Sequence, residues 1–219
     1  MGSNWLESTF YSQHGEDVII RKYFPKEKNE GFFVDVGAYQ PVSLSNTYYF
    51  YLKGWRGINI EPNPAAIEAF KRLRPKDINV QMGVAEAKAV LDYHMIADKP
   101  FENTFSTGQL INRHGHDQDT TVVKVPVDTL ANILKRYVPA GKEIDFFSID
   151  VEGLNYQVLK SNDWTLFRPS IVVVEKHFEE QEKNKAILEL MNLVGYQLDH
   201  DIFDSYFFVN DSFIPFDSL

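Results

Sequence analysis

The segment from residue 32 to residue 64 constrains the fold more than any other part of the sequence. It contains two short apolar runs, residues 32–36 and 57–60, and each is followed by a turn that carries a glycine or an acidic residue. Asn63 and Pro64 then open a helical pattern that extends to residue 74, because asparagine caps helices and proline is favoured in their first turn. A strand, a connection, a second strand and a helix are typical of a doubly wound α/β sheet.

Strand-like and helical runs alternate along most of the chain, which predicts a mostly parallel sheet with crossover helices. We expect further strands over residues 78–84, 144–149 and 171–175. Helical patterns cover residues 130–138, 154–159 and 181–193. A short polar link between residues 196–200 and 206–210 predicts a C-terminal antiparallel hairpin. The chain is therefore expected to form a single domain, residues 1–219, around a seven-stranded sheet.

The alternation breaks over residues 89–127, directly after the third expected strand. Residues 90–96 and 121–127 look like two strands, and the polar stretch between them includes Asn103, Thr104 and Ser106. Ligands of doubly wound folds bind beyond the carboxyl ends of the strands. We therefore expect this insertion to form one wall of a binding cleft.

Gly37 and Glu61 indicate the kind of ligand. A glycine after the first strand lets the backbone approach a ligand, and a carboxylate 24 residues later, at the tip of the second strand, can accept hydrogen bonds from two ribose hydroxyls. The first turn lacks the three-glycine pattern that binds a pyrophosphate at a helix N-terminus. The spacing favours a nucleoside cofactor without phosphates over the dinucleotide of an oxidoreductase, which is the second hypothesis for this fold.

Six short motifs are spread over most of the chain, at residues 12–17 (SQHGED), 34–38 (VDVGA), 45–47 (SNT), 54–57 (GWRG), 103–106 (NTFS) and 148–153 (SIDVEG). In this order they resemble the FkbM family of S-adenosylmethionine-dependent methyltransferases. The resemblance implies the class I methyltransferase fold, a Rossmann-like sheet whose last strand runs antiparallel, with S-adenosylmethionine as cofactor. It also implies O-methylation of a sugar or glycan, with polyketide or peptide natural products as alternative acceptors. A non-catalytic binding domain on the same fold is a third hypothesis.

Residues at the strand ends are expected to bind the cofactor. We assign Glu61 to the ribose, Asp35 and Gly37 to contacts from the first strand, Asn46 to the methionine end, and Gly83 and Val84 to the adenine. Asp35 has a second interpretation, as a buried carboxylate that holds the glycine-containing turn. Asp150 is also a candidate here, as the group that holds the methionine ammonium.

Methyl transfer to oxygen requires alignment of donor and acceptor and removal of the acceptor proton. Asp150 and Glu152 follow the fourth strand, and carboxylates at positions i and i+2 of an extended strand point the same way. Their mutual repulsion would raise one pKa, which suits a general base. His177, which follows the fifth strand, is the rival candidate.

No metal site is expected. His114, His116, Asp117 and Asp119 lie in one polar run and are interpreted as a solvated loop, because hard-metal sites need carboxylates from several elements. Asp150 and Glu152 have the oxygen ligands that magnesium prefers, but the family resemblance gives no support for a metal.

The net charge of −9, with lysine and arginine scattered, excludes a basic stripe for nucleic acid. It also disfavours a polyanionic acceptor, so we expect a neutral or singly anchored sugar. Asn103, Thr104 and Ser106 are expected to line its site, with Gln13 of the N-terminal segment as the next candidate. The basic residues expected near the strand ends or in the insertion are Arg56, Arg113 and Lys176.

The sequence has no cysteine, which excludes disulfides and thiolate metal sites. No apolar run approaches the roughly 20 residues that span a bilayer, and the N-terminus has no secretory pattern. We expect a cytoplasmic enzyme, and the oligomeric state has no recognisable signal in the sequence.

Overall fold

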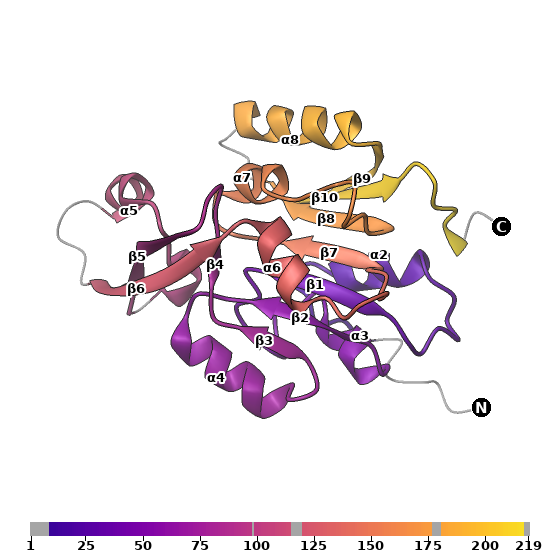
Figure 1. Cartoon of the computed structure of the whole chain (residues 1–219), viewed down its shortest axis with the longest axis horizontal. Helices are drawn as coiled ribbons and strands as arrows, with labels where there is room; N and C mark the ends of the chain where they lie inside the picture. Colours follow the sequence, from indigo (N-terminus) through magenta and orange to yellow (C-terminus); the bar gives the residue numbers. More distant parts are fainter. Residues whose placement is uncertain (1–8, 98, 115–119, 177–180, 217–219) are drawn as a thin grey trace.

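A computed structural model describes residues 9–97, 99–114, 120–176 and 181–216 (Figure 1). The strands of the main sheet are β1 (Phe32–Val36), β2 (Arg56–Ile60), β3 (Ile78–Val80), β7 (Phe146–Ile149), β8 (Ile171–Glu175), β9 (Tyr196–Ile202) and β10 (Ser205–Asn210). Three more strands form a second sheet: β4 (Gly83–Val84), β5 (Ala89–Ile96) and β6 (Thr120–Asp128).

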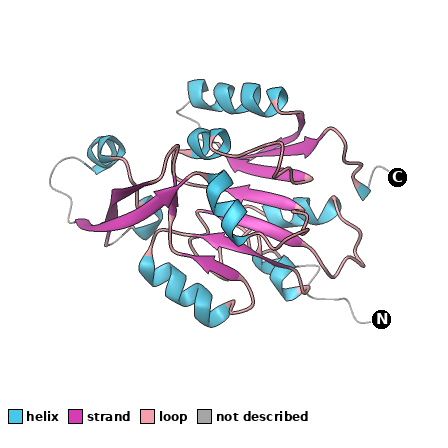
Figure 2. Cartoon of the chain, in the orientation of Figure 1, coloured by secondary structure: helices cyan, strands magenta, loops and turns pink. Residues whose placement is uncertain are grey.

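Helices flank the main sheet, as Figure 2 shows. They are α2 (Glu16–Lys22), α3 (Tyr48–Leu52), α4 (Pro64–Leu73), α6 (Leu130–Tyr137), α7 (Asn155–Lys160) and α8 (Gln181–Leu193). Helix α5 (Thr107–His114) and the 3-10 turn η1 (Pro100–Glu102) belong to the insertion instead. None of the helices in the described part of the chain has the length and apolar character required to traverse a bilayer.

The main sheet has the strand order β3-β2-β1-β7-β8-β10-β9. The pairs from β3 to β8 are parallel; in the centre, Val34 of β1 lies opposite Ile58 of β2 and Phe147 of β7. Strand β10 runs antiparallel to both β8 and β9. This arrangement confirms the predicted α/β sheet with a C-terminal antiparallel hairpin.

Alternate residues of the central strands face opposite sides of the sheet. Val34 and Phe147 belong to the buried cluster that packs against α6, α7 and α8. Phe33 and Phe146 belong to the cluster on the other side, which includes residues of α2 and α3. The central strands are buried on both faces, so their sequences are mostly apolar and do not alternate, with the buried polar residues Asp35 and Ser148 near their carboxyl ends.

The prediction of a single strand over residues 78–84 is wrong. The chain leaves the main sheet after Val80, and Gly83 and Val84 instead pair with Val127 and Asp128 of β6. An apolar run does not show which partner each residue will pair with, so the change of sheet was not visible in the sequence. The two strands expected in the insertion do form, as the antiparallel pair β5 and β6, and with α5 they project from the main sheet on the left of Figure 1.

Arg74, the C-cap residue of α4, is completely buried. Its guanidinium donates to the carboxylate of Asp77 at 2.8 Å and to the hydroxyl of Thr47 at 2.9 Å. The Thr47 hydroxyl donates in turn to Asp35 of β1 at 2.7 Å, and Asp77 accepts from the backbone N–H of Gly57 in β2 at 3.1 Å. The network therefore connects α4, the start of α3 and both strands that lead into the site.

Arg74→Ala should lower the free energy of unfolding by about 3–5 kcal/mol, because it leaves two buried carboxylates without their shared positive partner. Urea unfolding of the purified variant would measure this. Arg72→Ala, an exposed arginine on the same helix, is the matched control and should change stability by no more than about 0.5 kcal/mol. A loss below 1 kcal/mol for Arg74→Ala, on the order of a surface substitution, would contradict the proposed importance of the network.

Candidate active site

The carboxyl ends of β1, β2, β7 and β8 surround a cavity of about 410 Å³, a size typical of small-molecule sites. Parallel strands place these ends at one edge of the sheet, which brings Gly37, Glu61, Asp150 and Glu175 to the same cavity. Residues of the insertion complete its wall.

Gly37 forms the turn after β1 with a φ of 78°. A Cβ atom at this position would lie 1.7 Å from the backbone oxygen of Asp150, so only glycine fits between the β1 and β7 turns. The N–H of Gly37 donates to the carbonyl of Ile60 at 2.9 Å, which ties this turn to the end of β2. Gly37 therefore lines the cavity with backbone atoms and no side chain, so a ligand can approach the backbone closely.

Glu61 is 4% exposed and its carboxylate is held by the backbone on both sides. It accepts from the N–H of Tyr39 at 3.0 Å and from the N–H of Asn63 at 2.8 Å. Burial nevertheless raises the pKa of Glu61 to about 7, since desolvation outweighs these two hydrogen bonds. Each carboxylate oxygen keeps lone-pair capacity for a further donor, so the group can receive a pair of hydroxyls.

The insertion contributes an aromatic wall on the β3 side of the cavity. The ring of Phe105 packs against Gly83, where an added Cβ would lie 2.5 Å from the ring. Tyr93 lies beside it with ring centroids 4.7 Å apart, and its hydroxyl interacts with the side chain of Asn103. Burial raises the pKa of Tyr93, with a further contribution from the nearby Glu61. Together with Val84 and Glu61, these residues line the large cavity.

Asp35 does not line the cavity. It is 4% exposed and accepts the hydrogen bond from Thr47, and burial raises its pKa. These contacts favour the interpretation of Asp35 as a residue that holds the turn. Asn46 lines a second, smaller cavity instead, and its amide donates to the Ser148 hydroxyl at 3.1 Å.

The expected pairing of Asp150 with Glu152 on an extended strand is wrong. Strand β7 ends at Ile149, and Glu152 has a φ of 47° in a left-handed turn, so the two side chains are not related by strand geometry. Both still line the cavity. The turn is fixed by Asn155, which accepts from the N–H of Val151 and donates to the carbonyl of Glu175, each at 2.9 Å.

Asp150 interacts instead with Glu175, at the end of the neighbouring strand β8. Burial, together with the adjacent Asp150 carboxylate and a hydrogen bond to it, raises the pKa of Glu175 to about 11. The pKa of Asp150 is also raised, chiefly by desolvation. Two interacting carboxyl groups cannot both ionise at little cost, so the ionised form of one disfavours ionisation of the other.

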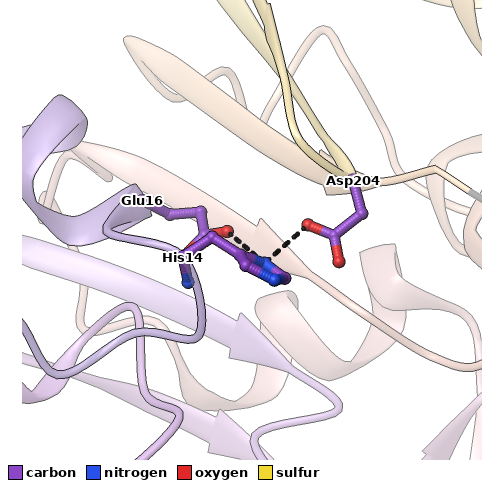
Figure 3. A group of neighbouring side chains, drawn as sticks. All are labelled: His14, Glu16 and Asp204. Atoms are coloured by element: carbon purple, nitrogen blue, oxygen red, sulfur yellow. Dashed lines mark hydrogen bonds and ion pairs between the residues drawn. The ribbon is translucent and has the colours of Figure 1, made fainter.

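The smaller cavity, of about 40 Å³, adjoins the large one through Gln13, Asp150 and Glu175, which line both. Glu16 and Asp204 also line it. Figure 3 shows the imidazole of His14 between these two carboxylates; its Nδ1 lies 3.5 Å from Glu16 and 3.2 Å from Asp204.

Among the described residues, His14, Glu16 and Asp204 each have one possible metal-ligand atom, and these three atoms lie within 4.8 Å of one another. They form a group that could hold a metal ion.

The N-terminal segment reaches the site because its backbone and side chains are tied down. The carbonyl of Tyr11 accepts from the N–H of Ser45 at 2.9 Å, and the hydroxyl of Ser12 donates to the buried Asp17 at 2.7 Å. Asp17 therefore anchors the start of α2, and Gln13 is the member of this segment that lines both cavities.

The other predicted site residues have different outcomes. Asn103 and Thr104 line the large cavity, whereas Ser106 is not among its lining residues. His177, His116, Asp117 and Asp119 lie outside the described residues, as does the side chain of His114. Arg56 and Lys176 do not line the cavity; they lie over the rings of Tyr51 and Tyr206 at 5.0 Å.

Sequence reasoning missed Glu175, Phe105 and Tyr93. Glu175 was visible as the acidic end of an apolar strand, in the same position that Asp150 occupies on its neighbour. Phe105 lies within the motif at residues 103–106, but its contact with Gly83 gave no signal, and neither did Tyr93, because both positions depend on the packing of the insertion.

A model of the methyltransferase FkbM domain matches residues 35–198. The chain belongs to the FkbM methyltransferase family. No curated protein sequence matches it at a significant level.

Among solved structures, this FkbM methyltransferase is similar to a fibrillarin pre-rRNA processing protein from Methanococcus jannaschii, with a TM-score of 0.52 and 11% identity over 92% of this chain and 75% of that one. A putative rRNA-methylase from Clostridium thermocellum gives a TM-score of 0.48 at 11% identity, covering 91% of this chain and 95% of the other. The fold is the Rossmann-like fold of class I methyltransferases, as expected.

Gly37→Ala should destabilise this FkbM methyltransferase much more than Gly141→Ala. Both glycines have positive φ, 78° and 74°, but nothing lies within 4 Å of an added Cβ at Gly141. The backbone conformation alone should cost about 1–2 kcal/mol at either site. The collision with Asp150 should bring the loss for Gly37→Ala to about 3 kcal/mol or more, measured by urea unfolding. Equal losses would show that the two turns are not in contact.

Proposed function

We propose that the protein is an S-adenosylmethionine-dependent O-methyltransferase that acts on a hydroxyl group of a sugar or glycan intermediate. The observation that carries the cofactor proposal is the bare backbone at Gly37 next to the buried carboxylate of Glu61, at the edge of one cavity. When bound, S-adenosylmethionine supplies an electrophilic methyl group on a sulfonium.

The residues around the cavity fit each part of this cofactor. Glu61 would accept hydrogen bonds from the ribose hydroxyls, and the Gly37 turn would allow the methionine portion to approach the backbone. The apolar side chains of Val84 and Phe105 would pack against the flat aromatic face of adenine. Since Phe105 contacts Gly83, we assign the insertion to the cofactor side, not to the acceptor wall that the sequence suggested.

The acceptor would then enter from the side of Gln13, Glu152 and Glu175. Asp150 is the preferred general base, because it lines the cavity and desolvation raises its pKa, which makes the carboxylate a stronger base. Glu175 would hold its own proton and orient Asp150 through their hydrogen bond. Asp150 would take the proton of the acceptor hydroxyl as the new oxygen–carbon bond forms.

A thermal-shift panel tests the proposal at the level of the cofactor. S-adenosylhomocysteine should raise the melting temperature, and NAD and NADP should not, since a dinucleotide requires a glycine-rich pyrophosphate turn. Stabilisation by NAD or NADP would favour the oxidoreductase. In a separate activity measurement, methyl transfer to a polyketide or peptide but not to sugars would favour the alternative acceptors.

The affinity of the site for 5′-methylthioadenosine should increase about tenfold between about pH 6 and pH 8. Ribose hydroxyls that donate to Glu61 favour its ionised form, so a bound nucleoside lowers a pKa that is about 7 in the free protein. The ligand lacks the amino-acid portion, which keeps Asp150 and Glu175 out of the measurement. Calorimetry at several pH values should show a flat profile for Glu61→Gln; the same slope in both proteins would exclude Glu61 from the ribose site.

Asp150→Asn should retain affinity for S-adenosylhomocysteine within a few-fold and lose methyl transfer by about 10²- to 10⁴-fold, as expected when a general base is removed. Glu152→Gln, a variant of another carboxylate lining the same cavity, should lose much less. If Asp150→Asn transfers methyl groups normally and His177→Ala does not, then His177 is the base.

A further inference from the structure

Residues with a strained backbone gather around the two adjoining cavities. In the described part of the chain, the residues other than glycine that have a left-handed backbone are Tyr39, Leu44, Glu152 and Phe203, with φ between 47° and 56°. The first three line the large cavity, and Leu44 lines the small cavity as well. This conformation is costly for an L-residue, because its Cβ atom approaches the following carbonyl oxygen. Such strain is typical of ligand sites and persists only where the surrounding structure imposes it.

Leu44 keeps a large apolar side chain in solvent at one of these positions. It is 48% exposed, so packing within the protein does little to offset the strain. The backbone is fixed by the next residue, Ser45, which is buried and donates its N–H to the carbonyl of Tyr11 at 2.9 Å. The Ser45 hydroxyl accepts from the N–H of Tyr48 at 3.1 Å. The fold therefore holds Leu44 where the two cavities adjoin.

Phe203 shows the same combination of strain and exposure. It is the first residue of the two-residue turn between β9 and β10, and the flanking residues Ile202 and Ser205 are paired. Hairpin turns favour glycine, asparagine or aspartate where φ is positive, yet here a phenylalanine is 57% exposed. Its ring stacks on the imidazole of His14, with ring centroids 5.3 Å apart. The next residue, Asp204, lines the small cavity, so Phe203 lies beside it.

Exposure alone would need no explanation, since single apolar residues are common on protein surfaces. Leu166 and Leu193 are also largely exposed, but neither has a positive φ. Glycine would adopt the backbone of Leu44 or Phe203 without strain. The turns therefore do not require these two side chains, and a contact outside the folded chain would account for them.

Both side chains lie on the side where the acceptor would enter. Leu44 lines the two cavities together with Gln13, and Phe203 stacks on the residue that follows Gln13 in the chain. A sugar ring has hydroxyl groups around its edge and C–H groups on its faces. Burial of a C–H face against aliphatic and aromatic side chains is favourable, because it removes apolar surface from water.

We infer that Leu44 and Phe203 bind the acceptor: they contact the C–H face of an uncharged sugar ring, whose hydroxyl edge then faces Asp150. The inference rests on the proposed function and adds two specificity-determining residues to it. The left-handed backbone keeps both side chains out of the core, where an acceptor can reach them.

Initial-rate kinetics with the methyl glycosides of glucose, galactose, mannose and rhamnose tests the inference. For a glycoside that the unaltered enzyme methylates, Leu44→Gly and Phe203→Gly should each raise KM about tenfold or more, since a buried apolar contact is lost. The kcat and the affinity for S-adenosylhomocysteine should change by less than about threefold, as expected when only acceptor binding is weakened. The melting temperature should stay the same or rise, because glycine relieves the strain.

Two further variants serve as controls. Phe203→Tyr keeps the aromatic ring and should leave KM within about twofold of the original value. Leu166→Gly removes a leucine that is 60% exposed and precedes β8, away from the cavity edge of the sheet, and should leave KM unchanged.

An unchanged KM in both glycine variants would overturn the inference. A fall in the melting temperature of both would do the same, because the side chains would then serve the fold. If S-adenosylhomocysteine binds but none of the glycosides is methylated, the proposed sugar acceptor is refuted and the inference with it. Failure of S-adenosylhomocysteine to bind would refute the proposed cofactor instead.

Discussion

The hydrogen bonds of the buried Arg74 guanidinium are the interaction on which the cavity edge of the sheet depends. The guanidinium lies within 5.3 Å of the ring centres of Phe33 and Phe70, and its hydrogen bonds reach Asp77 and Thr47. A charged side chain that is shielded from solvent needs every one of its hydrogen-bond partners. If one partner moves away, a buried charge is left uncompensated. The positions of α4, β1 and β2 are therefore coupled, and the two turns that carry Gly37 and Glu61 are fixed relative to each other before any ligand binds.

The site stabilises its buried acids in two different ways. Glu61 is held by two backbone N–H groups, which fix the carboxylate's position and leave its outer lone pairs free for a ligand. Asp150 and Glu175 are held by each other and by Asn155, which spans the ends of β7 and β8. The first arrangement suits a binding group whose position must not change. The second suits proton transfer, since a proton shared between two carboxyl groups can move with little rearrangement.

The sequence predicted the features that depend on local pattern. The strands at residues 32–36 and 171–175, the cap at Asn63 and the C-terminal hairpin all follow from apolar runs and turn residues, and the structure confirms them. The split of residues 78–84 between two sheets was not predictable, since either sheet buries the same apolar side chains. The Asp150–Glu175 pair and the contact of Phe105 with Gly83 depend on distances across the fold, which no spacing along the chain encodes.

The carboxyl groups that line the large cavity also give the proposed reaction a direction. A net charge of −9, with several carboxyl groups around one cavity, would attract the sulfonium of S-adenosylmethionine. Methyl transfer removes that positive charge from the cofactor and leaves a neutral thioether. The attraction between the sulfonium and the ionised carboxyl groups of the cavity would therefore be present for the substrate form and lost for the product form. The charge that draws the reactive cofactor into the cavity would not retain the spent one.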